Sequence, residues 1–317
     1  MDASRAPLRV VTFNIAHARA IDRALEVLRE ATPLRGADVL ALQEMDAPSV
    51  ERIARELRLN SLFTPGGVHP RTGRDFGCAI LSPWPLVEPR KVVLPHAARV
   101  TRLRRAAVGA TLLRGRQRVR VYSVHLGPPL AVSRGSRSDQ LQAILADASG
   151  SPDPVVLAGD FNSHGIGQEV VAAGYAWVTR DVGVTTRFLF FGFSFDHVFA
   201  RGLEPAADAV AFGVIEDARG ASDHRPVWAV LVPPSGRSGG DAEGGPSTST
   251  GRAYRERGRR EEGVPAGASL PRGGPRRPIR GRRCTARRAG GRRRAVRPVT
   301  ARPDDRPRAA SPVNPVC

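Results

Sequence analysis

Apolar residues recur in short runs from Leu8 to Val232, and these runs predict the secondary structure. Runs rich in β-branched and other apolar residues, bounded by polar residues, glycine or proline, are typical of strands. Nine of them span residues 8–16, 37–45, 76–82, 106–113, 119–126, 154–162, 194–200, 206–214 and 226–232. Apolar residues at helical spacing predict helices over residues 20–30, 48–59 and 137–148, with Ser49 as the N-cap of the second.

The order of these elements favours an α/β fold with two sheets. Each half of the chain mixes strands with helices, so the pattern is neither strict β–α alternation nor all-β. Nine strands are too many for one comfortable sheet in a domain of this size. We therefore expect two packed, mixed β-sheets flanked by helices over residues 1–232.

Residues 233–317 have a different composition and form the second predicted segment. This stretch holds 21 Arg and 7 acidic residues, 26 of its residues are Gly or Pro, and Tyr254 is its only aromatic residue. Too little apolar surface remains to offset chain entropy, so we predict a disordered basic tail. Such a tail is explained either by the codon bias of a G- and C-rich genome or by binding to nucleic-acid phosphates.

Other features of the sequence bound the environment and the partners. No run of apolar residues is long enough for a membrane span, and the N-terminus lacks the apolar stretch of a signal peptide. The three cysteines, Cys78, Cys284 and Cys317, show neither metal-site spacing nor a disulfide framework. The expectation is a cytoplasmic monomer.

Polar side chains that suit catalysis stand at or beside the ends of the predicted strands. They are Asn14, Glu44, His125, Asp160, Asn162, Asp196, His197, Asp223 and His224. Strand ends with a common direction gather on one edge of a sheet, where ligands bind. We therefore expect these residues, apart from His197, to converge on one site.

Each of these residues also has an ordinary structural interpretation. Taken singly, Asn14 suits a turn or cap, Glu44 a solvated strand end, and Asp160 with Asn162 an Asx turn. His125 suits a buried core histidine, and Ser222 with Asp223 and His224 suits the entry into a helix or a strand.

Other histidines and two further runs are given structural interpretations first. We expect the remaining histidines to be structural or solvated: His17, His69, His96, His164 and His197. His197 is excluded from the site because it adjoins Asp196, and neighbouring strand residues face opposite sides. The aromatic run 188–195 is interpreted as core plus a partly exposed loop, or as a substrate-facing lip. The four Arg of run 99–107 suit a solvated edge or a rim that contacts phosphate.

Six motifs together resemble the endonuclease/exonuclease/phosphatase superfamily. They are "TFNIA", "LALQEMD", "YSVHLG", "LAGDFNS", "FDHVFA" and "ASDHRPV", in the family's order over residues 8–232. The resemblance implies a four-layer α/β sandwich, in agreement with the two-sheet interpretation. It also implies hydrolysis of phosphodiester or phosphomonoester bonds with a divalent cation, usually magnesium, with manganese as the alternative.

The resemblance also implies a role for each matched residue. Glu44 corresponds to the principal metal ligand, Asn14 to an amide that orients the metal and a phosphate oxygen, and Asp223 to the acid that completes the metal site. Asp160 and Asn162 correspond to the pair that orients water and the scissile phosphate. His224 corresponds to the imidazole on the phosphoryl oxygens, held by Asp196. His125 corresponds to a second histidine, whose acidic partner the sequence does not identify.

The function predicted from the sequence is metal-dependent phosphoester hydrolysis, with DNA, RNA, a phospholipid head group and a small phosphate ester all open as substrates. A carboxylate can accept a proton from water, while a cation and an imidazole neutralise charge that develops on phosphoryl oxygens. The alternative is a non-catalytic nucleic-acid-binding protein that uses its basic tail. The presence of Glu44, Asp160, Asn162, Asp223 and His224 favours the enzyme.

Overall fold

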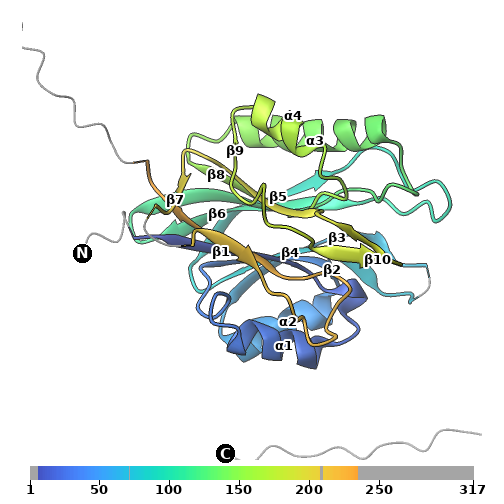
Figure 1. Ribbon diagram of the computed structural model, residues 1–317, viewed down its shortest axis with the longest axis horizontal. Helices are drawn as coiled ribbons and strands as arrows, with labels where there is room; N and C mark the ends of the chain where they lie inside the picture. The colour runs from blue at the N-terminus through green and yellow to red at the C-terminus, as the bar shows by residue number, and fades with distance from the viewer. Residues whose placement is uncertain (1–5, 71, 208–209, 235–317) are drawn as a thin grey trace, which may run out of the picture. The chain divides into compact units, whose positions relative to one another are not determined.

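Two mixed β-sheets pack face to face between two layers of helices (Figure 1). The computed structural model describes residues 6–70, 72–207 and 210–234. The predicted α/β sandwich is confirmed over this part of the chain. The last strand ends at Val232, and the predicted disordered tail lies, from residue 235 onward, outside the described residues.

The first sheet has the strand order β13-β15-β1-β2-β4-β3, with β14 paired to β15. Its strands are β1 Leu8–Asn14, β2 Val39–Met45, β3 Asn60–Val68, β4 Asp75–Ser82, β13 Glu204–Pro205, β14 Phe212–Val214 and β15 Val227–Val232. The second sheet has the order β5-β6-β7-β8-β12-β9. Its strands are β5 Leu86–Val93, β6 Ala106–Arg114, β7 Gln117–His125, β8 Val155–Asp160, β9 Ala176–Trp177 and β12 Asp196–Arg201. Strands β10 Thr186–Phe188 and β11 Phe191–Phe193 form a separate hairpin.

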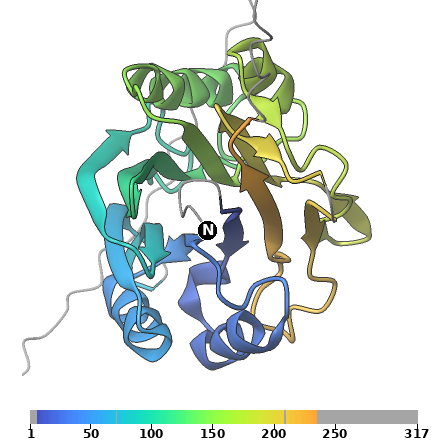
Figure 2. The ribbon, with the colours of Figure 1, turned by 90° about the vertical axis from the view of Figure 1, so that its left-hand side faces the viewer.

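Helices cover the outer face of each sheet, as the view along the strands shows (Figure 2). Helices α1 Ile21–Glu30 and α2 Ala47–Leu57 pack on the first sheet, and α3 Arg134–Ser149 and α4 Gly167–Ala172 pack on the second. A short 3₁₀ helix, Ala16–Ala18, follows β1. Three buried apolar clusters fill the three spaces between the four layers. Within the described residues, no helix is both long and apolar enough to cross a membrane.

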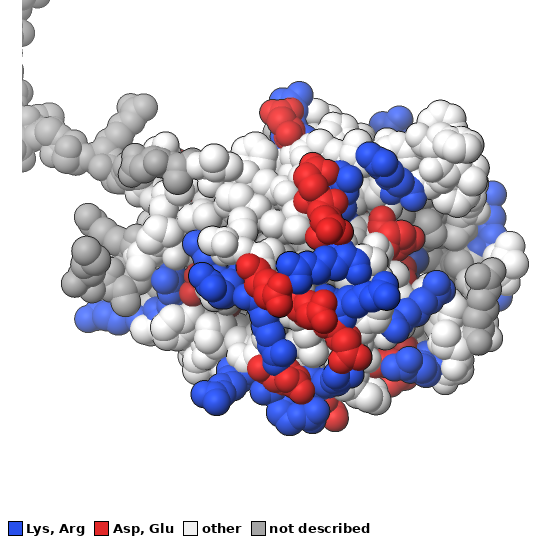
Figure 3. Space-filling model, turned by 60° about the horizontal axis from the view of Figure 1, so that its bottom comes forward, with Lys and Arg blue, Asp and Glu red and all other residues white. Residues whose placement is uncertain are grey.

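The outer face of α1 and α2 carries charges of both signs. Figure 3 shows basic and acidic side chains interleaved on this face. Arg29 pairs with Glu56, Arg52 with Asp22, and Arg219 with Glu30. Exposed pairs of this kind contribute little to stability. The balance of charge indicates a solvated face and not a binding surface for an anionic partner.

Three predictions about the elements are corrected by the structure. The N-cap of α2 is Asp46, whose carboxylate accepts a hydrogen bond from the Ser49 N–H at 2.9 Å, so Ser49 lies inside the helix. Strands β3 and β5 were missed, and so were the short strands β9, β10, β11 and β13. In the predicted strand 206–214, the described residues form a strand only over Phe212–Val214.

Candidate active site

The two sheets bring the ends of four strands to the same edge of the sandwich. In the first sheet, β1 and β2 run parallel and end near Asn14 and Glu44. In the second, β7 and β8 run parallel, with His125 in register with Asp160. Asp196 reaches this edge differently, because it is the first residue of β12, which runs antiparallel to β8 and pairs Asp196 with Asp160. The ladder therefore fixes three functional side chains on adjacent strands.

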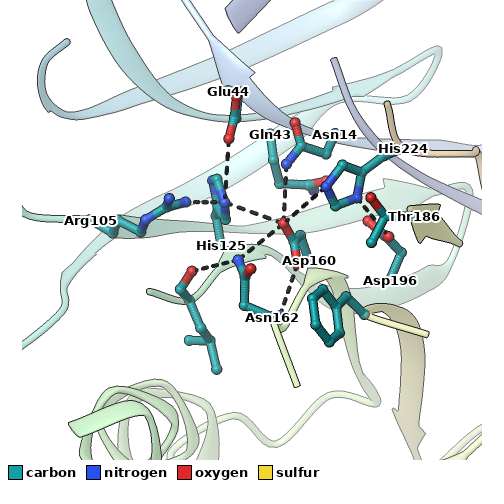
Figure 4. Close-up of polar contacts among 12 residues, drawn as sticks. Asn14, Gln43, Glu44, Arg105, His125, Asp160, Asn162, Thr186, Asp196 and His224 are labelled. Atoms are coloured by element: carbon teal, nitrogen blue, oxygen red, sulfur yellow. Dashed lines mark hydrogen bonds and ion pairs between the residues drawn. The ribbon is translucent and has the colours of Figure 1, made fainter. Parts of the chain in front are cut away.

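The Oδ2 atom of Asp160 is the centre of the polar network (Figure 4). It accepts hydrogen bonds from the side-chain amides of Asn14 and Asn162, both at 3.1 Å. The Nε2 atoms of His125 and His224 lie 3.3 Å and 3.8 Å from the same oxygen. One buried carboxylate oxygen thus joins residues from β1, β7, β8 and the segment before β15.

The "GDFN" sequence forms a tight structure around this carboxylate. The Oδ1 atom of Asp160 accepts a hydrogen bond from the Asn162 N–H at 2.8 Å, which is the Asx turn that the sequence also suggested. The Asn162 amide donates further to the Leu126 carbonyl at 2.9 Å. Gly159 is required because a Cβ atom there would collide with the carbonyl of Val124 on β7. The turn and the site are therefore the same structure, since the turn orients the carboxylate.

Asp160 is held in its ionised form by its neighbours. Burial alone favours the neutral acid, but His224, His125 and the hydrogen bonds around Asp160 outweigh it and lower the pKa of this carboxyl well below its usual range. A carboxylate with such a low pKa holds a proton poorly. It is better suited to orienting donors than to keeping an abstracted proton.

Asp196 and His224 form a buried pair next to this centre. The Nδ1 atom of His224 lies 2.8 Å from Oδ2 of Asp196, and the Thr185 hydroxyl donates to the same oxygen at 2.7 Å. Burial lowers the pKa of His224, but the carboxylates of Asp196 and Asp160 outweigh it and raise this pKa to about 10. His224 is therefore cationic at neutral pH.

His125 has the opposite charge state. Burial, followed by the nearby Arg105 guanidinium, lowers the pKa of His125 despite the neighbouring carboxylates. Arg105 lies in hydrogen-bond contact with the Nε2 atom of His125, and Oε1 of Glu44 is 3.8 Å from it. The site thus presents one neutral and one cationic imidazole on either side of Asp160, the separation of pKa values that divides acid and base roles in active sites.

Glu44 owes its orientation to an irregularity in β2. The pairing of β2 with β4 shifts register between Leu42 and Met45, and Glu44 has a φ of 58°. Non-glycine residues rarely adopt this conformation, and bulges near active sites redirect side chains. The Oε2 atom of Glu44 accepts a hydrogen bond from the backbone N–H of His17 at 3.1 Å.

Glu44 and Asp223 line one pocket of about 330 Å³ together with His224, His17 and Ser222. Burial raises the pKa of Glu44, but the neighbouring side chains of His125, Arg105 and His17, of which Arg105 is the permanent cation, outweigh burial and lower this pKa overall, so Glu44 is ionised. Two carboxylates in an open pocket are hard oxygen donors of the kind that magnesium prefers. The residues present therefore fit a divalent cation.

A second group of metal-ligand side chains lies beside this pocket. Asp160, Asp196 and His224 each offer one ligand atom within 4.8 Å of the others. His224 and Asp196 already bond to one another, however, and Oδ2 of Asp160 accepts two amide hydrogen bonds. Glu44 and Asp223, which line the open pocket, therefore stay the predicted cation ligands, and this cluster lies beside them.

Polar contacts between the sheets lie beneath the site and keep its two halves aligned. Gln43 on β2 donates to the Ser123 hydroxyl on β7 at 3.0 Å, and Ser123 donates to the Leu42 carbonyl at 3.1 Å. All three residues are fully buried. Buried groups that satisfy one another in this way specify a single alignment of the sheets.

The structure brings together the residues predicted for the site. Those around Asp160 and the adjoining pocket are Asn14, Glu44, His125, Asn162, Asp196, Asp223 and His224. Both polar ends of the Asn14 amide are engaged, since Nδ2 donates to Asp160 and Oδ1 accepts from the Ala16 N–H at 3.1 Å. Its role as a metal ligand stays a prediction.

The structure also adds residues that sequence reasoning did not select. His17 contacts Glu44, Arg105 contacts His125, and Thr185 contacts Asp196. The sequence held a signal for Arg105. If β6, which follows "RVTRLRR", pairs antiparallel with β7, which contains "VYSVH", the start of β6 lies near His125. His197 lies apart from the site, among Phe161, Trp177 and Phe199.

Comparison with known proteins gives a family match over most of the described chain. The model described as "Endonuclease/Exonuclease/phosphatase family" matches residues 11–224. None of the curated proteins searched matches the sequence.

Solved structures with a similar fold are numerous, and three illustrate the range. An endonuclease/exonuclease/phosphatase from Beutenbergia cavernae has a TM-score of 0.59 at 25% identity, with 72% of each chain covered. TDP2 from D. rerio, in complex with single strand DNA product, has a TM-score of 0.54 at 18% identity, covering 71% of this chain and 99% of that one. Sphingomyelinase C from Streptomyces griseocarneus has a TM-score of 0.53 at 20% identity, with coverage of 71% and 99%.

Proposed function

The chain belongs to the endonuclease/exonuclease/phosphatase family, and we propose that it is a metal-dependent hydrolase that cleaves phosphoester bonds, preferably phosphodiesters, by attack of water. One observation carries the proposal. A buried, ionised Asp160 is surrounded by His125 and His224, and the pocket at their side is lined by the carboxylates Glu44 and Asp223. This arrangement combines a place for a cation with a place for a phosphoryl group.

Glu44 and Asp223 would hold the cation, and Asn14 stays a predicted third ligand. A bound divalent ion neutralises phosphoryl oxygens and the charge that develops on them. The low pKa of Glu44 keeps its carboxylate available for this purpose at neutral pH. Magnesium is the expected ion, because its ligands are carboxylate and amide oxygens and water.

His224, which lines the same pocket, would stabilise the phosphoryl group. Its Nδ1 atom is used by Asp196, so Nε2 is the ring nitrogen left to face the substrate. A cationic imidazole fixed before the reaction stabilises developing negative charge without reorganisation. Asp196 acts through His224 as a positioning residue, and Thr185 in turn fixes Asp196.

Asp160, Asn162 and His125 would orient water against the phosphorus atom. Asp160 accepts hydrogen bonds from groups on both sheets. Because its pKa is low, its carboxylate stays ionised and can accept a hydrogen bond from a water O–H. Neutral His125 is the group nearby that can take up a proton at neutral pH. Arg105 holds His125 neutral and in place.

The test is a panel of phosphoesters with a matched pair of variants. Bis(p-nitrophenyl) phosphate, a phosphomonoester, single-stranded oligonucleotides and phosphatidylcholine are assayed with magnesium, with manganese and with excess chelator. We expect turnover of at least one diester with either metal and none with chelator. Folded His224→Ala should lose this turnover, whereas His164→Ala, outside the site, should keep it. Metal-independent turnover, or equal turnover by both variants, would contradict the proposal.

A further inference from the structure

The hairpin of β10 and β11 carries an exposed apolar surface that the fold does not use. Its two strands pair Thr186 with Phe193 and Phe188 with Phe191, and Leu189 and Phe190 connect them. Exposure increases from the base to the tip: Phe193 is 36% exposed, Phe191 66% and Phe190 99%. Phe188 and Leu189 are 62% and 75% exposed. Of the predicted core and partly exposed loop in run 188–195, these five residues therefore belong to the exposed part.

The tip is apolar against its own local preferences. Leu189 has a φ of 55°, in the left-handed region where a two-residue hairpin loop favours glycine or asparagine. A branched apolar residue at this position costs conformational energy and leaves its side chain in water. Neither solubility nor turn formation explains leucine here, so a binding role is indicated.

The base of this hairpin is fixed to the candidate active site. The Thr186 hydroxyl donates to the Asp223 carbonyl at 3.1 Å, and Thr186 forms a β-bridge with His224. Thr185, the residue before β10, bonds to Asp196 through its hydroxyl and to the Phe193 carbonyl through its N–H at 2.8 Å. The apolar tip thus projects from a rigid base that adjoins Asp223 and His224.

We propose that this hairpin inserts its tip into a phospholipid surface and that the phosphoester reached by the site belongs to a lipid head group. This inference rests on the proposed phosphoester hydrolysis and names the class of substrate for the same site. In a phospholipid bilayer the phosphates lie in the interfacial layer that borders the hydrocarbon core. An apolar projection beside a phosphoryl-binding pocket matches that arrangement, and aromatic side chains are favoured at membrane interfaces.

The charge of the hairpin favours lipid over nucleic acid. Between Val184 and Phe195 the only charged residue is Arg187, which lies near the base and is exposed. Nucleic-acid binding takes most of its affinity from basic side chains on phosphates, and the tip has none. A single arginine at the base suits the level of the lipid phosphates when the tip is inserted.

The experiment measures binding of the full chain to vesicles of phosphatidylcholine alone. These vesicles carry no net charge, so the basic tail is not attracted to them. The test variant combines Leu189→Gly, which suits the positive φ and relieves the turn, with Phe190→Ser. The control is Val210→Ser, which removes an apolar side chain of similar exposure, 74%. Val210 precedes Ala211, whose carbonyl accepts a hydrogen bond from the Val230 N–H near the end of β15 that is far from His224. We expect cosedimentation of the wild type and the control, and binding weaker by about tenfold or more in the double variant.

The same proteins separate this inference from the proposed function. Turnover of vesicle phosphatidylcholine is compared with turnover of soluble bis(p-nitrophenyl) phosphate, and we expect the ratio of the two rates to fall in the double variant. Vesicle binding without hydrolysis of either ester would leave the docking in place and overturn the proposed function. Absent vesicle binding by the wild type, or equal binding by the double variant, would overturn the docking. If the double variant binds vesicles as the wild type does but loses oligonucleotide binding, the hairpin is a nucleic-acid contact. If it binds vesicles as the wild type does but loses a dimer that light scattering detects in the wild type, the hairpin contacts a second copy of the chain.

Discussion

The Nδ1 atom of His224 lies 2.8 Å from the Oδ2 atom of Asp196, although the two residues are 28 positions apart in the chain. Their contact depends on the fold, because Asp196 begins β12 in the second sheet and His224 precedes β15 in the first. Thr185 fixes Asp196 from the other side at 2.7 Å. The sequence, read with the family resemblance, predicted this pairing, and the structure has it.

Asp196 contacts the Nδ1 atom of His224, and we propose that it acts through this ring, so removing either residue should disable the same unit. We expect His224→Ala and Asp196→Asn each to lower kcat for a soluble phosphodiester by about 10²-fold or more, the loss typical of one preorganised stabilising group. The double variant should be little worse than His224→Ala. A double-mutant cycle measures this, with circular dichroism to verify folding. Fully additive losses in folded variants would mean that the two residues act separately.

The role of Glu44 can be tested by measuring metal binding, without an activity assay. Glu44→Gln removes one ionised oxygen donor from the pocket that it shares with Asp223. We expect magnesium or manganese affinity, measured by isothermal titration calorimetry, to fall by about tenfold or more. Glu204→Gln, at the exposed edge strand β13, is the matched control and should bind as the wild type does. Unchanged affinity in folded Glu44→Gln would remove Glu44 from the metal site.

Strands with clear apolar runs could be predicted, and the four strands at the sheet edges could not, of which β3 and β5 are the longest. β3 contains Pro65, Gly66 and Gly67, and β5 contains Pro89 within a largely exposed sequence. Both lie at the ends of their sheets, where proline and charged residues are tolerated because one side of the strand needs no partner. Local pattern reasoning treats such residues as strand breakers, since it does not know the strand's position in the sheet.

The site shows the same division. Residues at the ends of apolar strands, such as Asp160, stand out because a buried strand rarely ends in an acid without a reason. Arg105 and His17 reach the site through strand register and through the 3₁₀ segment after β1, and these depend on tertiary structure. Likewise, an aromatic run such as 188–195 has the composition of a core strand. Only the position of the hairpin outside both main sheets shows that its tip faces water.

Arg105 should therefore be essential in a way that its neighbours in the same arginine run are not. Arg105→Met removes the guanidinium that contacts His125 and helps to lower its pKa, so we expect that pKa to rise and turnover to fall by about tenfold or more. The His125 ring is followed by NMR over a pH titration. Arg104→Met, one residue earlier and exposed, is the matched control and should change neither quantity. If both variants keep wild-type turnover and the His125 titration is unmoved, Arg105 is structural.

His197 gives a prediction about acid stability that lies outside the site. It is buried among Phe161, Trp177 and Phe199, and burial lowers its pKa from 6.5 to about 4. Between these two pH values the unfolded chain binds a proton that the folded chain does not. The free energy of unfolding should therefore decrease as pH falls from 6.5 towards 4, by about 1.4 kcal/mol per pH unit from this residue alone.

His197→Phe replaces the ring by one that suits the same aromatic surroundings and cannot titrate. Urea unfolding curves, recorded with chelator at several pH values, give the free energy of unfolding for both proteins. In the wild type the Nε2 atom of His197 lies 3.1 Å from the Ser194 carbonyl oxygen, and the variant loses this hydrogen bond. The loss should lower the free energy of unfolding by a similar amount at every pH. Above pH 6.5 the two profiles should run parallel, and below it the profile of the variant should be flatter. Parallel profiles over the whole range down to pH 4 would show that His197 is already protonated in the folded protein, and that its burial does not lower its pKa.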